Sequence, residues 1–221
     1  DVILCVPDTL IREISEKTKN IFSGGQNCHI EASGAFTGDI SAEMIKDAGA
    51  SHVIVGHSER RVNYNENNNL IKSKAQTALN EGLKAIICIG ETLKERETGI
   101  TLDIIKKQLL ESLPQEITGE TIIIAYEPVW AIGTGLTPSI EQITEVHDFI
   151  RAELENNYGK RYNANIFNIK KICIDCDYSE SGLFKSFEKD IDLLENLNLD
   201  LIIRGNTGIL KGEILKIAKL G

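Results

Sequence analysis

Residues 121–135, Thr121-Ile-Ile-Ile-Ala-Tyr-Glu-Pro-Val-Trp-Ala-Ile-Gly-Thr-Gly135, join an apolar run to a carboxylate and then to a loop. The run Thr121–Tyr126 predicts a buried strand, and Glu127 follows at its carboxyl end. The loop begins with the stiff step Pro128-Val-Trp130 and ends in small residues. A carboxylate in this position suits a general base under a closing lid. By itself, the stretch is equally compatible with a strand-to-helix turn that carries a solvated Glu127.

Similar apolar runs recur along the chain and alternate with helical patterns. Several runs are apolar at consecutive positions, as expected for strands that are buried on both faces of a parallel sheet. The strand candidates are Val2–Val6, Ile21–Gln26, His52–Gly56, Lys84–Ile89, Thr121–Tyr126, Lys171–Ile174 and Leu201–Ile203.

Two of the helices have clear signals at their ends. Ser41 can cap a helix over Ala42–Ala48, which Gly49 ends. Thr137 followed by Pro138 predicts the start of another helix. The apolar side of that helix is expected to carry Ile140, Ile143, His147, Ile150 and Leu154.

The 221 residues contain no linker or low-complexity segment, so we expect a single α/β domain over residues 1–221. Seven strands fit an open doubly wound sheet. They also fit an eight-stranded (β/α)8 barrel that lacks one strand, and periodicity does not separate the two. No G-x-G-x-x-G motif follows an early strand, which disfavours a dinucleotide-binding sheet.

Charge and cysteine content exclude several classes of partner. A net charge of −9 and a pI near 5.1 disfavour nucleic acid and acidic membrane surfaces as partners. No apolar run reaches the roughly 18 residues of a membrane span, and the start of the chain lacks the basic residues of a signal peptide. Five cysteines, an odd number, favour reduced thiols in a cytoplasmic protein. Cys173-Ile-Asp-Cys176 has no second pair or nearby His, so no metal site is assigned.

A second strand also delivers a polar residue at its end, in Val53-Ile-Val-Gly-His-Ser-Glu-Arg-Arg61. Residues 58–61 predict a short helical turn after His57, whose amide groups disfavour a charged imidazole. Since parallel strands collect their carboxyl ends on one face, His57 and Glu127 should converge. A carboxylate base and a neutral imidazole suit proton transfer next to a carbonyl, without a cofactor. A lone His is nevertheless more often a core or surface residue.

Six stretches, in this order, resemble the triosephosphate isomerase family, and together they cover roughly residues 1–155. They are Gln26-Asn-Cys28, Gly34-Ala-Phe-Thr-Gly-Asp-Ile-Ser41, Gly56-His-Ser-Glu-Arg-Arg61, Cys88-Ile-Gly-Glu91, Glu95-Arg-Glu97 with Gly99, and Ala125 through Gly135.

The resemblance implies a (β/α)8 TIM barrel that interconverts dihydroxyacetone phosphate and D-glyceraldehyde 3-phosphate, a step of glycolysis and gluconeogenesis. A Glu base and a neutral His electrophile are this family's known pair, so Glu127 and His57 take these roles from the resemblance. Residues 128–136 become the lid, in which the amide of Gly133 would contact the substrate phosphate. Glu59 and Cys88 match residues that support the site.

The resemblance also implies a homodimer. The loop Gly34–Ser41 would reach into a second subunit and bring Thr37 near the partner's site. The apolar pair Ala35-Phe36 suits a loop tip that becomes buried.

Three departures from the family pattern stand out. The family opens with a strand that carries an Asn and a catalytic Lys, and one β/α unit before Asp1 is expected to be absent; losing that Lys should cost at least ~10²–10³ in rate. The phosphate-binding Gly-Gly-Ser turn is replaced around Ile174–Ser179, where acidic residues would repel a phosphate. The last glycine pair becomes Arg204-Gly205, of which Gly205 still offers an amide.

These departures leave two alternatives to a triosephosphate isomerase. One is a catalytically silent, barrel-derived protein whose phosphate site has decayed. The other is an isomerase or aldolase for a different small carbonyl compound, with an intact acid-base pair beside an altered phosphate pocket.

Overall fold

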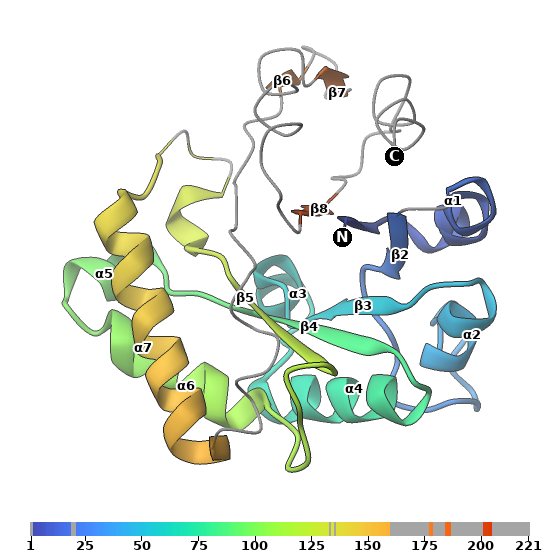
Figure 1. Ribbon diagram of the computed structural model, residues 1–221, viewed down its shortest axis with the longest axis horizontal. Coiled ribbons are helices and arrows are strands. Elements are labelled where there is room, and N and C mark those ends of the chain that lie inside the picture. Colours follow the sequence, from blue (N-terminus) through green and yellow to red (C-terminus); the bar gives the residue numbers. More distant parts are fainter. Residues whose placement is uncertain are drawn as a thin grey trace.

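Six parallel strands form one curled sheet in the order β5-β4-β3-β2-β1-β8 (Figure 1). The computed structural model describes residues 2–18, 21–132, 134, 136–159, 177–178, 184–186 and 201–204. The strands of the sheet are β1 Val2–Cys5, β2 Ile21–Gly25, β3 His52–Val55, β4 Lys84–Ile89, β5 Ile122–Tyr126 and β8 Leu201–Arg204. A separate antiparallel pair consists of β6 Asp177–Tyr178 and β7 Phe184–Ser186.

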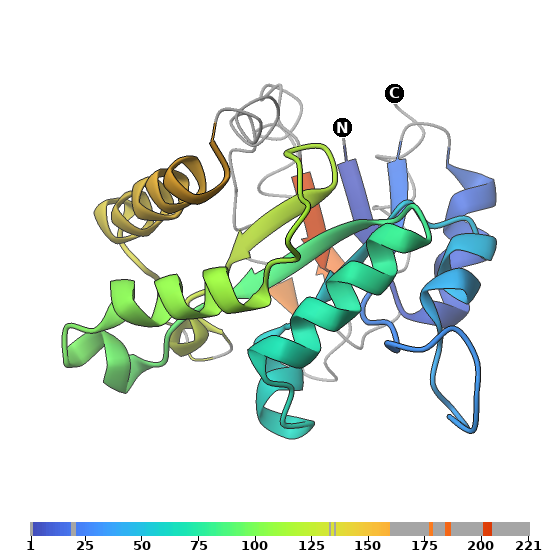
Figure 2. The same ribbon diagram turned by 90° about the horizontal axis from the view of Figure 1, so that it is seen from below.

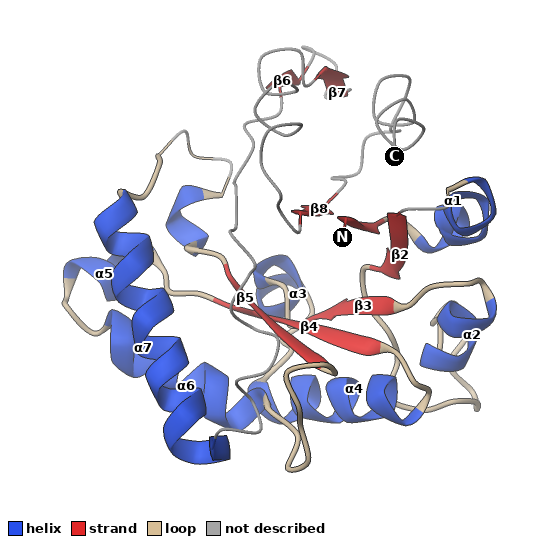
Figure 3. Ribbon diagram, in the orientation of Figure 1, coloured by secondary structure: helices blue, strands red, loops and turns tan. Residues whose placement is uncertain are grey.

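Helices follow the strands and cover the outer side of the sheet (Figure 3). They are α1 Ile11–Lys17, α2 Ala42–Asp47, α3 Ser58–Asn63, α4 Asn68–Asn80, α5 Leu93–Glu97, α6 Thr101–Ser112 and α7 Ile140–Tyr158, with 3-10 turns η1 Asp8–Leu10 and η2 Val129–Ala131.

Alternate residues of β1, β3, β4 and β5 pack into different cores on the two faces of the sheet. Ile86 belongs to a small core on the inner face, whereas its neighbour Ile87 packs in the larger core between the sheet and the helices. An open doubly wound sheet would instead carry helices on both faces. Among the described residues, the inner core consists of strand side chains alone, which confirms the expected barrel architecture as a partial (β/α) barrel. Its buried members are Ile3, Cys5, Ile54, Ile86 and Cys88.

The predicted start of the second helix is confirmed. The Ser41 Oγ accepts a hydrogen bond of 3.1 Å from the amide of Met44, as an N-cap should. After α2, Gly49 adopts φ +98°, a conformation that glycine tolerates without the cost of a side chain.

The predicted start of the last described helix is wrong by two residues. Helix α7 begins at Ile140, and Ser139 caps it in a reciprocal capping box with Gln142. Ile140 is 78% exposed, so it does not belong to the buried side of the helix. The residues of α7 that are buried are Val146, Ile150 and Leu154. The first turn of α7 contributes nothing to the core because burial of the helix begins only at Val146.

Several sequence predictions lie outside the described residues. These are Gly133, Gly205, the strand Lys171–Ile174 and the pair Cys173 and Cys176. Of the helices in the described ranges, none combines the length and the apolarity that crossing a membrane would require. The single domain over residues 1–221 remains a prediction.

The burial of α7 leads to a stability prediction. Replacing Ile150, which is 7% exposed, by Ala should lower the free energy of unfolding by about 2–5 kcal/mol, since a cavity remains in the core. Ile140→Ala is the matched control and should change it by less than about 0.5 kcal/mol. Urea denaturation of both variants measures the difference, and equal losses would contradict the assigned face of α7.

Candidate active site

His57 stands where β3 ends and α3 begins. Its φ of −55° and ψ of 143° make it the N-cap of α3, and its side chain caps the helix. The ring atom Nδ1 accepts a hydrogen bond of 3.2 Å from the amide of Glu59. Because an accepting Nδ1 carries no hydrogen, the hydrogen-bond pattern assigns a neutral ring with its proton on Nε2. The expected neutral imidazole therefore has a local structural cause.

Glu127 meets this ring directly. His57 Nε2 lies 2.9 Å from Glu127 Oε2, and the two side chains are 6% and 14% exposed. The amide of Ser58 donates to Glu127 Oε1 over 3.0 Å. The fold thus brings together the two residues that the sequence predicted to converge. A carboxylate that can accept a proton faces an N–H that can donate to an oxygen, in a site largely closed to water.

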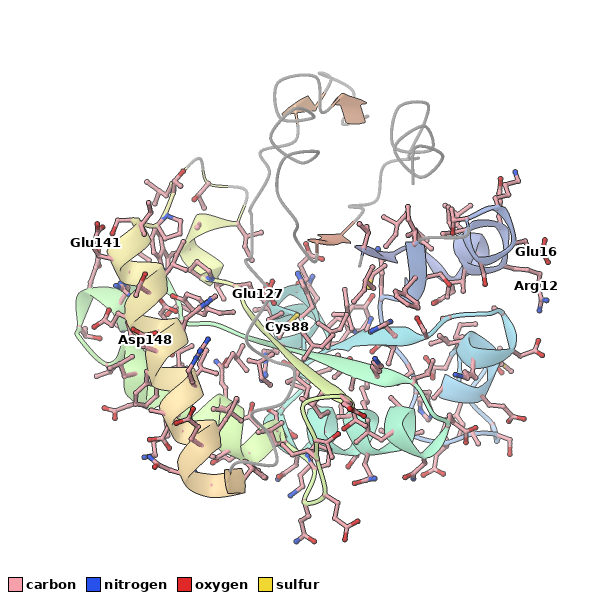
Figure 4. The ribbon with its side chains drawn as sticks, in the orientation of Figure 1. Arg12, Glu16, Cys88, Glu127, Glu141 and Asp148 are labelled. Atoms are coloured by element: carbon pink, nitrogen blue, oxygen red, sulfur yellow. The ribbon has the colours of Figure 1, made fainter. Side chains whose placement is uncertain are left out.

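Cys88 and Glu59 flank this pair in different ways. Cys88 lies on β4 opposite Ala125 of β5 and is 4% exposed within the inner core. Figure 4 shows Cys88 and Glu127 near the middle of the view, far from the α1 residues Arg12 and Glu16. The Glu59 carboxylate is half exposed, with Oε2 3.9 Å from His57 Nδ1. Cys88 therefore forms part of the packed floor, whereas Glu59 acts on the ring mainly through its amide.

The backbone of Glu127 packs directly against Gly90. The amide of Glu127 donates to the carbonyl of Ile89 over 2.9 Å. A side chain at residue 90 would place its Cβ only 1.8 Å from the Glu127 carbonyl oxygen. The amide side chain of Gln108 holds Gly90 from the other side, accepting from its N–H at 2.9 Å and donating to its C=O at 3.0 Å. Glycine is required here for close approach, not for an unusual φ.

Glu91 fixes the first residues of the predicted lid. It follows β4 and is fully buried. Its carboxylate accepts from the Tyr126 hydroxyl at 3.0 and 3.1 Å and from the Trp130 indole N–H at 2.9 Å. The Arg96 guanidinium lies 3.6 Å away and supplies an opposite charge. Burial, and then the neighbouring Glu91, raise the pKa of Tyr126, so its hydroxyl remains a donor.

The sequence predicts no catalytic or binding role for Glu91, Gln108 or Arg61. A signal for Glu91 was available, since it follows a buried strand in the same way as His57 and Glu127. Gln108 lies on a helix distant in sequence from Gly90, so no local pattern reveals it. Arg61 donates to the carbonyls of Gly56 and Cys88 over 2.8 and 3.0 Å, contacts that depend on the tertiary fold.

The remaining predicted residues lie away from this pair or outside the described ranges. Thr37 belongs to the exposed loop between β2 and α2, which projects from the body of the molecule (Figure 2). Gly133 and Gly205 are not among the described residues.

The described residues do not favour a cysteine nucleophile or a metal ion in this site. Burial raises the pKa of Cys5 and Cys28 to about 12, so neither thiol is an activated nucleophile. Within the ranges that the structure describes, no three His, Cys, Asp or Glu side chains form a group suited to a metal ion. The arrangement can move a proton between a carboxylate and a substrate whose oxygen contacts His57.

The contacts of Glu91 lead to a prediction about the lid. Trp130→Phe removes a hydrogen bond to a buried carboxylate, a contact worth about 1.5–3 kcal/mol. The amides of Ala131 and Ile132 should then exchange with deuterium about tenfold faster or more. Tyr126→Phe removes a donor to the same carboxylate from the strand, and it should leave these lid amides near their wild-type rates. Unchanged exchange in Trp130→Phe would exclude Glu91 as the anchor of the lid.

Known proteins with similar sequences and structures carry the same name. A family model described as triosephosphate isomerase matches residues 1–168. The triosephosphate isomerase of Ruegeria sp. (strain TM1040) is 51% identical over 159 residues, which cover 72% of this chain and 65% of that protein. The triosephosphate isomerase of Bartonella quintana (strain Toulouse) is 50% identical over 161 residues, which cover 72% of this chain and 63% of that protein.

A solved structure agrees. The crystal structure of triosephosphate isomerase from Bartonella henselae matches with a TM-score of 0.72 and 40% identity, over 92% of this chain and 78% of that one. The chain spans a little under two thirds of the length of the curated relatives above, 63% to 65%. The match of the family model over most of its length shows that this chain belongs to the triosephosphate isomerase family.

Proposed function

We propose that the protein interconverts dihydroxyacetone phosphate and D-glyceraldehyde 3-phosphate, with Glu127 as the base and His57 as the electrophile. The observation that carries this proposal is the 2.9 Å contact between His57 Nε2 and Glu127 Oε2. It joins a proton acceptor and a neutral N–H donor within a distance that one three-carbon substrate can bridge. Family membership supports the same reaction.

The free-state contacts indicate how substrate would enter. The N–H of His57 now donates to Glu127, and the carbonyl oxygen of the substrate would take that place. Glu127 would then turn toward the adjacent carbon and remove a proton, while His57 stabilises the negative charge that develops on oxygen. His57 would pass its Nε2 proton to that oxygen and take up the hydroxyl proton of the other oxygen, while Glu127 returns its proton to the neighbouring carbon, which completes the isomerisation through an enediolate. Every step uses side chains of this chain, and no cofactor is needed.

The lid and the two phosphate contacts belong to the same proposal. Glu91 holds Trp130 at the start of the lid, so that residues beyond it can close over the substrate. The amides of Gly133 and Gly205 are proposed to bind the phosphate, and Cys88 and Glu59 to support the pair. The buried, reduced thiols of Cys5 and Cys28 support a cytoplasmic location.

Substitution of the base tests the reaction. Glu127→Gln keeps the shape of the side chain but cannot accept the proton, so kcat should fall by about 10²- to 10⁴-fold. The measurement is a coupled assay with D-glyceraldehyde 3-phosphate. Glu116→Gln, an exposed residue on the connection after α6, is the matched control and should retain the wild-type rate.

The assay separates the alternatives. It is run on the 221-residue chain and on any product of the reading frame that extends upstream of Asp1. Equal rates for wild type and Glu127→Gln would exclude Glu127 as the base and favour a catalytically silent protein. A Glu127-dependent rate with another small carbonyl compound, and none with the triose phosphates, would favour a different isomerase or an aldolase.

We also propose that the protein forms a homodimer through the loop between β2 and α2. Residues 31–39 of this loop are all exposed, and Phe36 keeps 40% of its surface accessible while its ring packs on His29. His29 Nδ1 accepts a hydrogen bond from the amide of Glu31, which shapes the start of the loop. An ordered loop with an exposed aromatic side chain suits insertion into a second copy. Thr37, next to Phe36, would then approach the partner's site.

Charge at the loop tip should dissociate this dimer. Phe36→Glu places a carboxylate where an apolar ring is expected to be buried, so sedimentation equilibrium should show mainly monomer at micromolar concentration. Ile140→Glu introduces the same charge at the start of α7, on the opposite side of the molecule (Figure 1), and should leave the association state unchanged. A wild-type monomer, or a Phe36→Glu dimer, would contradict the proposed interface.

A further inference from the structure

The side chain of Arg61 connects three parts of the fold beside the proposed catalytic pair. Its Nε donates to the Gly56 carbonyl at 2.8 Å and its Nη2 to the Cys88 carbonyl at 3.0 Å. Its Nη1 donates to Asn68 Oδ1, the first residue of α4, at 2.6 Å. One guanidinium therefore joins the end of β3, the end of β4 and the start of a helix.

The two carbonyls lie where backbone pairing between β3 and β4 stops. The register of these strands ends with Val55 opposite Ile87. Gly56 then turns to φ +72° and leaves the extended conformation. Beyond the pair Val55 and Ile87, the two hydrogen bonds of the Arg61 guanidinium connect the ends of β3 and β4 in place of backbone pairing.

Each carbonyl is also close to one member of the catalytic pair. Gly56 directly precedes His57. Cys88 precedes Ile89, whose carbonyl accepts the amide of Glu127, and then Gly90, on which the Glu127 backbone rests. The position of Arg61 thus links the strand end that carries His57 to the strand end that supports Glu127.

Asn68, which accepts from the Arg61 guanidinium, is itself held by two residues of α6. Asn68 Oδ1 also accepts from Ser112 Oγ at 3.3 Å, and Asn68 Nδ2 donates to Glu111 Oε2 at 2.8 Å, both on α6. Burial lowers the pKa of Arg61, while nearby Cys88 and Glu127 act in the opposite direction. A guanidinium stays charged in proteins, so losing these acceptors would leave costly unsatisfied donors.

We propose that Arg61 is a positioning residue that sets the separation of His57 and Glu127 through the Gly56 and Cys88 carbonyls, without touching substrate. The proposal rests on the isomerase function proposed above. A displacement of about 1 Å between reacting groups can cost about 10²-fold in rate, so a small shift of either strand end matters.

The variant Arg61→Lys tests whether the hydrogen-bond geometry of Arg61, and not its positive charge alone, is needed for catalysis. Lys keeps the positive charge but cannot span the acceptors that a planar fork joins. We expect kcat to fall about 10- to 100-fold with KM nearly unchanged, because the loss falls on the transition state. Arg12→Lys, at an arginine paired with Asp47 on the surface, is the matched control and should behave as wild type. In Arg61→Ala, free guanidinium below denaturing concentrations should restore part of kcat.

A second readout does not need turnover. With ¹⁵N-labelled histidine, the wild-type ring of His57 should show a protonated Nε2 and an unprotonated Nδ1, with His57→Gln giving the assignment among the four histidines. In Arg61→Lys the Nε2–H signal should broaden or disappear, as the contact with Glu127 no longer persists. Asn68→Ala, which removes the support of the fork, should weaken the signal in the same direction even if Arg61→Lys folds poorly.

The outcomes separate this proposal from the proposed function. If the wild type does not turn over, the isomerase assignment fails and the His57 signal alone decides on Arg61. A wild-type kcat or an unchanged Nε2–H signal in folded Arg61→Lys overturns the positioning role. A raised KM with an unchanged signal also overturns it, since Arg61 would then act on the substrate by its charge.

Discussion

The hydrogen bond between His57 Nε2 and Glu127 Oε2 exists because both residues follow strands that run in the same direction within one sheet. Parallel strands deliver the residues after their carboxyl ends to a single rim. Glu91 follows β4 and reaches the same rim, where it holds the start of the lid. The distance between Glu127 and His57 is therefore a property of the sheet, and the loops complete the site around it.

Buried charges in this rim each have partners that offset the cost of removing them from water. Glu91 receives hydrogen bonds from a hydroxyl and an indole, with a guanidinium nearby. Glu66 is 2.7 Å from Arg60 Nε of α3 and 2.6 Å from Lys74 Nζ of α4, and it connects these two helices. These contacts connect Glu91, after β4, to β5, η2 and α5, and Glu66, in the turn after α3, to α3 and α4.

Local sequence signals predicted the parts of the fold that depend on neighbouring residues. The strands were recognisable from consecutive apolar positions, and Ser41 from its place before a helical pattern. For α7, Thr137 and Pro138 predict a start two residues too early, although the capping box of Ser139 and Gln142 is also present in the sequence. The predicted apolar side of α7 wrongly includes Ile140, because hydrophobic periodicity does not show which turns of a helix contact the core.

The sequence by itself placed a carboxylate, Glu127, and an imidazole, His57, after buried parallel strands, and this predicted that the two side chains converge on one rim. Only the tertiary structure decided how they meet. The contact of His57 Nε2 with Glu127, the packing of the Glu127 backbone against Gly90 and the hydrogen bond from Arg61 to Cys88 depend on atoms from different β/α units. Hydrogen bonds depend on distances of tenths of an ångström, whereas apolar burial is not directional. A pattern of apolar residues therefore predicts the core, but it does not predict these contacts.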